Sequence, residues 1–468
     1  MTRELGASRS LRRAVLSVGI GIALWCAPAA WARAANNART TADEPQYLMT
    51  ALSLAEDHNL DVSDERAAGR YRDWHEAGLP LQEATQSDGS RVSPHDPLLP
   101  ALLALPVKLG GWLGAKLALS VLAGALAATT VWVAVARFGV PVGTAVVTVV
   151  AFSASAPLAV YATQVYPEIA AALAVTVAIG AITGPLSRRG WFALGAAVIA
   201  LPWLSIKYAP VAATLAALGL ARAWRDGRRR ELVAFATALG AGAVLFVIAH
   251  LSWYGGLTPY ASGSHFATGE LRVMGVAPNY VGRSARLVGL LTDRSFGLAA
   301  WQPAYVLAVP AFAALLRLRP RGWSELALPF GAGFLNASFV AMTMHGWWFP
   351  GRQVVVVLPA SVIAVAWAVE RLRVASRALV VAAAAGVSVY AWLVAQALLA
   401  HLRTVVSFET LAHPLWRAWR LLLPDYRALT LTDRALHGVW IVVLASLASW
   451  GWRRAGYEGR RSPVAEHV

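Results

Sequence analysis

Charged residues are scarce in this chain: Asp, Glu, Lys and Arg make up 14% of its 468 residues, whereas hydrophobic residues make up 57%. A soluble globular chain usually carries roughly a quarter charged residues, so this composition excludes an ordinary soluble protein. Apolar runs of about 20 residues recur along the sequence, and that length crosses a hydrocarbon core of about 30 Å as an α-helix. The chain is therefore predicted to be an all-α polytopic membrane protein.

Cysteine is almost absent, and acidic residues are fewer than basic ones. Cys26 is the single cysteine, which excludes an intrachain disulfide framework and a cysteine-rich metal site. The excess of 41 basic over 25 acidic residues gives a formal net charge of +16, which could suggest nucleic-acid binding. Most arginines, however, stand in short clusters between apolar runs, where the positive-inside rule places them. We therefore expect the lipid bilayer as a partner of this chain and no nucleic acid.

About twelve apolar runs are predicted to be transmembrane helices. They cover residues 14–31, 112–136, 140–161, 169–186, 191–206, 209–224, 232–253, 301–316, 323–344, 354–369, 379–402 and 436–452. If every run spans, the arginine clusters all fall on one side, which the positive-inside rule makes cytoplasmic. The arginines in question are Arg137, Arg188, Arg189, Arg228, Arg229, Arg230, Arg317, Arg319, Arg321, Arg371, Arg373, Arg377, Arg453 and Arg454.

The first apolar run follows arginines at positions 3 to 13, which are expected on the cytoplasmic side, with Asp43 outside. A cleavable signal peptide ending near the Ala-Arg-Ala at 32–34 is the alternative interpretation. Both interpretations place Asp43 on the extracytoplasmic side of the cell membrane.

A single integral membrane domain is predicted over residues 1–455, with a short cytoplasmic tail at 456–468 and both termini cytoplasmic. The first extracytoplasmic loop is long, at about 34–111, and two further outer loops cover about 254–300 and 403–434. Nearly all the polar residues that need an explanation fall on outer loops and turns. The active site is therefore expected to face the extracytoplasmic side.

The first loop begins with adjacent carboxylates, Asp43 and Glu44, in the stretch "TTADEPQYLMTALSLAED". Thr41 or Asp43 could cap a helix here, and Pro45 suits its first turn. Apolar residues then recur at helical spacing, which predicts a helix lying in the membrane interface. The two acids are either part of a helix start or functional groups at the bilayer edge.

The same loop ends in "SPHDPLLPALLALPVKLGG". His95 and Asp96 stand between prolines, directly before an oily segment that prolines interrupt too often for an ordinary span. We expect a second interfacial or re-entrant piece here. His95 and Asp96 form either a simple turn or part of a substrate site.

Several charged residues stand at outer helix ends without a topological reason. Glu168, in "TQVYPEIAA", is a carboxylate at an apolar helix boundary, which is costly unless it is paired or functional. Lys207, Arg294 and Arg352 are cations on the side that the positive-inside rule leaves without them. Each cation either snorkels to lipid headgroups or helps to bind a phosphate. The candidate substrate-binding residues are His95, Asp96, Tyr166, Glu168, Lys207, Tyr208, Arg294 and Arg352.

Carboxylates and cations at one membrane surface suit transfer of a sugar from a lipid phosphate. A carboxylate can deprotonate an acceptor hydroxyl, and cations can stabilise a departing phosphate. Asp43 with Glu44 or Glu168 could also hold Mg²⁺ or Mn²⁺ through oxygen ligands. The chain has no GxxxxGK[ST] motif, so a role for ATP is not indicated.

At these residues the sequence resembles the GT-C superfamily of membrane glycosyltransferases, in particular its protein O-mannosyltransferase and aminoarabinose-transferase branch and actinobacterial relatives. Its motifs stand in order from Asp43 to Pro359 and are "DEPQYL", "HDPLLPALLALP", "YPE", "LPWLSIKYA", "LLTDRSFGLAAWQPAYVLA" and "WWFPGRQVVVVLP".

The resemblance implies an inverting hexosyl or pentosyl transfer from a polyprenyl-phosphate-linked sugar to a glycan, lipid or protein acceptor. It implies Asp43 as the catalytic carboxylate, with the adjacent Glu44 as a second catalytic residue in a supporting role, and Lys207 and Arg352 on the donor phosphate. His95 departs from the aminoarabinose branch, which has a lysine there.

Two other classes of protein remain open. A transporter or lipid flippase would suit about twelve helices, but the commonest twelve-helix transporters have repeated halves, and no such repeat is visible. A polysaccharide polymerase or ligase using lipid-linked glycans would place key residues in the late outer loop, where His413, Arg417 and Arg420 lie.

Overall fold

The computed structural model describes residues 2–34, 37–76, 78–263, 279–372, 376–404 and 408–461, and the regular elements in these ranges are all helical. Arg373, the middle of the predicted 254–300 loop, residues 405–407 of the late loop and the end of the predicted tail lie outside the described residues. The α-helices are α1 (Thr2–Cys26), α2 (Glu44–Glu56), α3 (Ser63–Ala67), α4 (Leu98–Phe138), α5 (Val142–Ser153), α6 (Leu158–Tyr161), α7 (Glu168–Ile182), α8 (Arg188–Leu204), α9 (Ala209–Arg225), α10 (Arg229–Tyr254), α11 (Tyr280–Arg283), α12 (Arg286–Thr292), α13 (Leu298–Trp301), α14 (Ala308–Leu318), α15 (Trp323–Leu335), α16 (Leu358–Leu372), α17 (Ser376–Leu398), α18 (Pro414–Arg420) and α19 (Leu431–Arg461).

The helices confirm an all-α, multi-pass membrane protein. By length and composition, six helical segments in the described ranges can cross a membrane: Arg9–Trp31, Leu98–Phe138, Arg229–Ser262, Arg352–Leu372, Leu379–Leu398 and Leu431–Tyr457. Val142–Ser153, Glu168–Ile182 and Pro303–Leu318 are shorter apolar helices. Each apolar run predicted from the sequence contains a helix, whereas the number of about twelve crossings stays a prediction.

Helix α4 is two helices joined at a kink. Gly110 has φ −142° and ψ 15°, and Gly111 has φ 57° and ψ −146°, so neither residue is helical. The positive φ of Gly111 is accessible to glycine without the steric cost that a side chain would add. The kink separates the oily segment after Asp96 from the next apolar run, at the position that the sequence predicts. Before the kink, one face is exposed and carries Leu102, Leu105 and Leu109, as suits contact with lipid.

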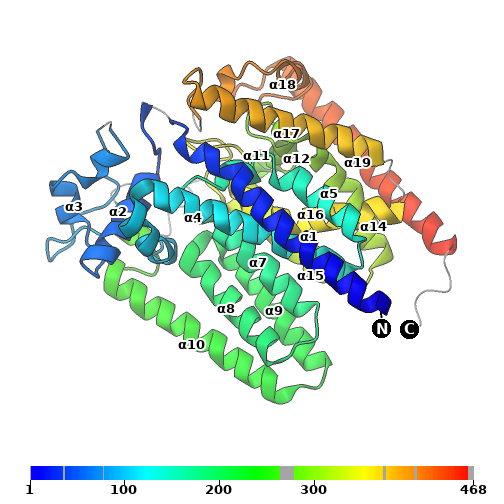
Figure 1. Ribbon diagram of the computed structural model, residues 1–468, viewed down its shortest axis with the longest axis horizontal. Helices are drawn as coiled ribbons and strands as arrows, with labels where there is room; N and C mark the ends of the chain where they lie inside the picture. Colours follow the sequence, from blue (N-terminus) through cyan, green and yellow to red (C-terminus); the bar gives the residue numbers. More distant parts are fainter. Residues whose placement is uncertain are drawn as a thin grey trace.

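Close packing of small residues joins α1 to α4. A β-carbon added at Gly124 of α4 would lie 2.3 Å from the carbonyl oxygen of Gly19 in α1, so the two backbones touch without side chains between them. Small residues allow this approach between helices in membranes. In Figure 1, α8, α9 and α10 pack side by side, and the C-terminal end of α10 reaches the part of the molecule that holds α2 and α3.

The segment Arg352–Leu372, which contains η10 (Arg352–Val357) and α16, is enclosed by the rest of the protein. Inside the structure, 83% of its apolar window is buried, against 11% for the window in α19. Arg352 therefore begins a segment that other helices surround, and its charge requires partners from those helices.

Candidate active site

The carboxylate of Asp43 points away from the helix that it precedes. Asp43 occupies the N-cap position of α2, but its side chain makes no capping hydrogen bond. Its Oδ2 instead lies 3.0 Å from Nη2 of Arg352, and its Oδ1 accepts a hydrogen bond of 3.4 Å from Gln82 Nε2. Of the two interpretations left open for Asp43, a helix-capping role of its side chain is therefore not observed, because the charge-assisted contact to a guanidinium outcompetes a backbone N–H.

The electrostatic surroundings keep Asp43 ionised. Burial by itself raises the pKa of Asp43, but the positive charge of Arg352 and the imidazole of His95 outweigh it and hold the pKa well below the usual range for aspartate. The side chain of Asp43 is still 26% exposed. A molecule arriving from outside can therefore reach a carboxylate that is already deprotonated.

Glu44 anchors the start of α2 to the turn before α7. Its Oε2 accepts the backbone N–H of Thr41 at 3.0 Å, and its Oε1 accepts the N–H of Val165 at 2.8 Å. The side chain is buried, and burial raises the pKa of Glu44. Both oxygens are thus engaged with the backbone. Thr41 contributes its N–H to this arrangement, and Glu44 has a positioning part in the site.

Glu168 joins two cations from different parts of the chain. It begins α7, directly after Pro167, and is fully buried. Its Oε1 lies 2.7 Å from Nζ of Lys207, in η4 (Ile206–Tyr208), and 3.0 Å from Nε of Arg352. Arg352 therefore holds Asp43 with one nitrogen and Glu168 with another. We refer to Asp43, Glu168, Lys207 and Arg352 as the charged cluster.

Two aromatic rings flank the guanidinium of Arg352. Its Cζ lies 4.0 Å from the ring centroid of Tyr166 and 5.1 Å from that of Trp348, which are favourable cation–π distances. The hydroxyl of Tyr166 also accepts the backbone N–H of Asp43 at 3.4 Å. Nζ of Lys207 lies 5.1 Å from the ring centroid of Tyr208. Tyr166 and Tyr208 therefore border the charged cluster.

His95 lies next to Asp43 of the charged cluster, whereas Asp96 contacts residues around the cluster. Nε2 of His95 lies 3.9 Å from Oδ2 of Asp43, and its ring centroid is 4.6 Å from that of Tyr47. Asp96 is buried, and burial raises its pKa. Its Oδ2 accepts the N–H of Ile206 at 2.9 Å, and its Oδ1 lies 3.1 Å from Nε2 of His250. Asp96 thus ties the turn carrying Lys207 to α10.

Arg294 lies in a different network. Its Nε donates to the carbonyl oxygens of Arg420 and Leu423, and its Nη2 lies 3.1 Å from Oδ1 of Asp433. In the part of the chain that the structure describes, these contacts join Arg294 to the end of α18, the segment after it and the first turn of α19, and not to the charged cluster. The partners of Arg294 are thus backbone carbonyls and a carboxylate outside the charged cluster, and its part in substrate binding stays a prediction.

Several residues at the site were not predicted. His250 interrupts an apolar membrane helix, and a polar side chain in such a helix is costly unless paired, so this signal was available. Gln82, which contacts Asp43, and Asn336, whose Nδ2 donates to the carbonyl oxygen of Lys207 at 3.0 Å, carry no local signal. The carboxylates considered for a divalent cation contact protein donors: Glu44 binds backbone N–H groups, and Asp43 and Glu168 bind cations.

The fold and the cluster define a polytopic α-helical membrane protein with a partly buried ion-pair site beside the first loop. No family model matches the sequence, and no curated protein sequence matches it. Two solved structures share the fold. ArnT from Cupriavidus metallidurans bound to undecaprenyl phosphate gives a TM-score of 0.54 at 14% sequence identity, over 94% of this chain and 74% of that one. The apo state of the same ArnT gives a TM-score of 0.50 at 16% sequence identity, over 95% of this chain and 77% of that one. The GT-C resemblance is thereby confirmed at the level of the fold.

Proposed function

We propose that this protein is an inverting glycosyltransferase that moves a sugar from a polyprenyl phosphate to an acceptor on the extracytoplasmic side of the membrane. The observation that carries this proposal is the convergence of Asp43, Glu168, Lys207 and Arg352 from distant parts of the chain. The ArnT fold, in a protein whose solved structure holds undecaprenyl phosphate, supports a polyprenyl-phosphate donor. The acceptor is a glycan, lipid or protein hydroxyl.

The cluster is electrically balanced before substrate binds, with two carboxylates facing two cations. A donor phosphate that approaches Arg352 and Lys207 adds negative charge beside the ion pair between Arg352 and Asp43. It competes with Asp43 for the guanidinium, since Arg binds phosphate through strong charge-assisted hydrogen bonds. Asp43 then becomes a stronger base at the moment when the donor is in place.

In the transfer step Asp43 removes the proton of the acceptor hydroxyl, and the oxygen attacks the anomeric carbon of the sugar. The bond from that carbon to the phosphate oxygen breaks, and the phosphate leaves with the bonding electron pair. Arg352 and Lys207 stabilise the charge that develops on the leaving phosphate. Glu168 keeps both cations in place, and Tyr166 and Trp348 hold the guanidinium plane. No step in this scheme uses a divalent metal.

The test is sugar transfer from a panel of undecaprenyl-phosphate sugars by the purified protein in liposomes. Asp43→Asn keeps the shape of the side chain and removes the base, so we expect about a 10²–10⁴-fold loss of turnover. The matched control is Asp88→Asn, because Asp88 is an exposed loop carboxylate that hydrogen-bonds only within its own turn, to Ser90. Undiminished turnover of a folded Asp43→Asn protein would overturn the assignment.

The other two classes are separated by the same preparation. Movement of a lipid-linked sugar across the liposome without transfer would favour a flippase. The polymerase alternative depends on the late loop, where His413 accepts the N–H of Trp416 and Arg417 donates to the carbonyl oxygen of Leu411. These contacts favour a structural part for that loop. Loss of activity in Arg417→Ala together with an active Asp43→Asn would favour the polymerase.

A further inference from the structure

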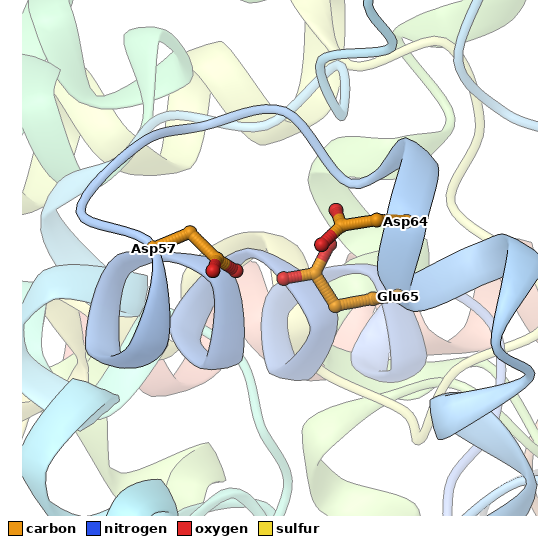
Figure 2. Close-up of side chains that lie close together, drawn as sticks. All are labelled: Asp57, Asp64 and Glu65. Carbon is orange, nitrogen blue, oxygen red and sulfur yellow. The ribbon is translucent and has the colours of Figure 1, made fainter.

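A second group of acids lies in the first loop, apart from the charged cluster. Asp57 is the C-cap residue of α2, and Asp64 and Glu65 lie in the first turn of α3. Figure 2 shows their three side chains pointing toward one another from these two elements. One carboxylate oxygen from each residue lies within 4.8 Å of the other two.

Glu65 differs from the acids of an ordinary exposed cluster because it is buried. The residue as a whole is only 3% exposed, and neither carboxylate oxygen has a hydrogen-bond partner among the described residues. Asp57 and Asp64, toward which it points, are exposed. A buried carboxylate without a partner is costly, and two further carboxylates at this distance add repulsion. The three acids therefore form a group with excess negative charge among the described residues.

The two arginines nearest to Glu65 in the sequence do not form an ion pair or a hydrogen bond with it in the described part of the chain, although the charge of Arg70 acts on Glu65 through space. Nη1 and Nη2 of Arg70 form hydrogen bonds of 3.0 and 3.1 Å with the two carboxylate oxygens of Glu56. Arg66 pairs with Glu83 and donates from Nη1 to the carbonyl oxygen of Leu79 at 3.2 Å. Both guanidinium groups beside Glu65 are thus directed to other acceptors.

We propose that Asp57, Asp64 and Glu65 bind a divalent cation, and that Ca²⁺ fits better than Mg²⁺. All three ligands are hard oxygen donors, which these ions prefer. Ca²⁺ takes oxygens at about 2.3–2.6 Å, so two ligands of one ion can be up to about 5 Å apart, whereas Mg²⁺ at about 2.1 Å requires a tighter group. The exposed sides of Asp57 and Asp64 leave room for the waters that complete the coordination.

The ion would join the end of α2 to the start of α3. Because α2 begins at Glu44, directly after its N-cap residue Asp43, the cation would hold the far end of the helix that follows the first residue of the charged cluster. This inference does not depend on the proposed transferase activity. The competing explanation is a proton: without a cation, burial and then the nearby Asp64 raise the pKa of Glu65 to about 8.

The experiment is calorimetric titration of CaCl₂ into the full-length protein in detergent, after removal of divalent ions with a chelator. We expect one Ca²⁺ per chain with a Kd of about 10⁻⁴–10⁻³ M, as in extracellular modules, and weaker binding of Mg²⁺. Glu65→Gln keeps the shape of the side chain and should abolish this binding. Asp88→Asn, which removes an unrelated loop carboxylate, should retain it.

Thermal unfolding distinguishes the cation from the proton. At a Ca²⁺ concentration tenfold above Kd, binding multiplies the folded-to-unfolded ratio by about eleven, so the wild-type Tm should rise with CaCl₂ but not with NaCl of equal ionic strength. Glu65→Gln should melt at a higher temperature than the chelated wild type and show no response to CaCl₂. Absence of Ca²⁺ binding by the wild type, or equal binding by Glu65→Gln, would overturn the proposal.

Discussion

Asp43 and Arg352 form an ion pair with an oxygen–nitrogen distance of 3.0 Å, although one precedes the first helix of the long loop and the other begins the most enclosed membrane segment. The other contacts of Arg352 in the charged cluster explain what this pair can do. Arg352 is also held by Glu168 at 3.0 Å, so its position does not depend on Asp43. In the proposed reaction, a donor phosphate would therefore displace Asp43 from the guanidinium while Glu168 still holds that guanidinium in place.

Replacing Arg352 by lysine should impair transfer while keeping the charge. Arg352 contacts Asp43 through Nη2 and Glu168 through Nε, and a single ammonium group cannot reproduce this fork. Loss of one charge-assisted hydrogen bond is worth about 1.5–3 kcal/mol, so kcat/KM should fall at least about tenfold in the liposome assay. Arg189→Lys, at an exposed position in α8, is the control and should leave kcat/KM unchanged. Equal activity of Arg352→Lys and wild type would contradict the view that Arg352 must contact Asp43 and Glu168 at the same time.

Glu168→Gln should destabilise the folded protein, because it removes one partner of a buried ion pair. The change removes the only carboxylate that Lys207 shares with Arg352 in the described contacts. Removing one partner of a buried ion pair typically costs about 3–5 kcal/mol. Thermal melting in detergent should show a clear decrease in Tm. Glu231→Gln breaks an exposed pair with Arg228 and should cost less than about 1 kcal/mol; similar shifts for both variants would argue against a buried structural role of Glu168.

The contact between α1 and α4 can be tested with two alanine substitutions. Gly124→Ala would place a β-carbon 2.3 Å from the carbonyl oxygen of Gly19, whereas Gly21→Ala meets no atom within 4 Å. Overpacking of this kind costs about 1–3 kcal/mol, so Gly124→Ala should lower the Tm. Gly21→Ala should be neutral or slightly stabilising, since alanine is the better helix former. A Tm of Gly124→Ala at or above that of Gly21→Ala would show that the helices do not touch there.

Acidification should weaken the first loop through His75. Burial lowers the pKa of His75 below its usual 6.5, and neither the carbonyl oxygen of Thr40, 3.2 Å from Nδ1, nor Glu76 restores it. Below pH 6.5 the unfolded histidine takes up a proton that the folded one takes up only at lower pH. The unfolded state then binds more protons, so stability falls as the pH decreases from about 7 through the folded pKa.

The variant that checks this effect is His75→Asn, whose amide can still donate to Thr40. Its Tm should fall less between pH 7 and pH 5 than the Tm of the wild type. An identical pH dependence of the two proteins would exclude His75 as the source.

The class of the protein and the places of its helices were accessible from the sequence. Long apolar runs predict membrane helices because a span needs a continuous hydrocarbon-compatible surface, and this property is local. The oily segment before Gly111 was likewise predicted to be separate from the span that starts at residue 112, because its prolines act within a few residues of where they stand; the kink itself at Gly110 and Gly111 is a finding of the structure. Asp43 and Glu44 were correctly placed at a helix start, but the sequence did not show which of them turns toward the backbone.

Tertiary structure alone decided which charges meet. Arg294 and Arg352 look alike in sequence, as cations at outer helix ends, yet Arg294 binds Asp433 and Arg352 binds Asp43 and Glu168. The same holds for Glu65, whose neighbours in sequence do not reveal that it is buried without a partner. Hydrophobic patterning is read from adjacent residues, whereas an ion pair such as that between Asp43 and Arg352 exists only because packing brings together side chains that lie far apart in the sequence. The sequence therefore determined a membrane-embedded helical chain with polar groups at the ends of its apolar runs, and the packing of its helices determined which of these groups meet.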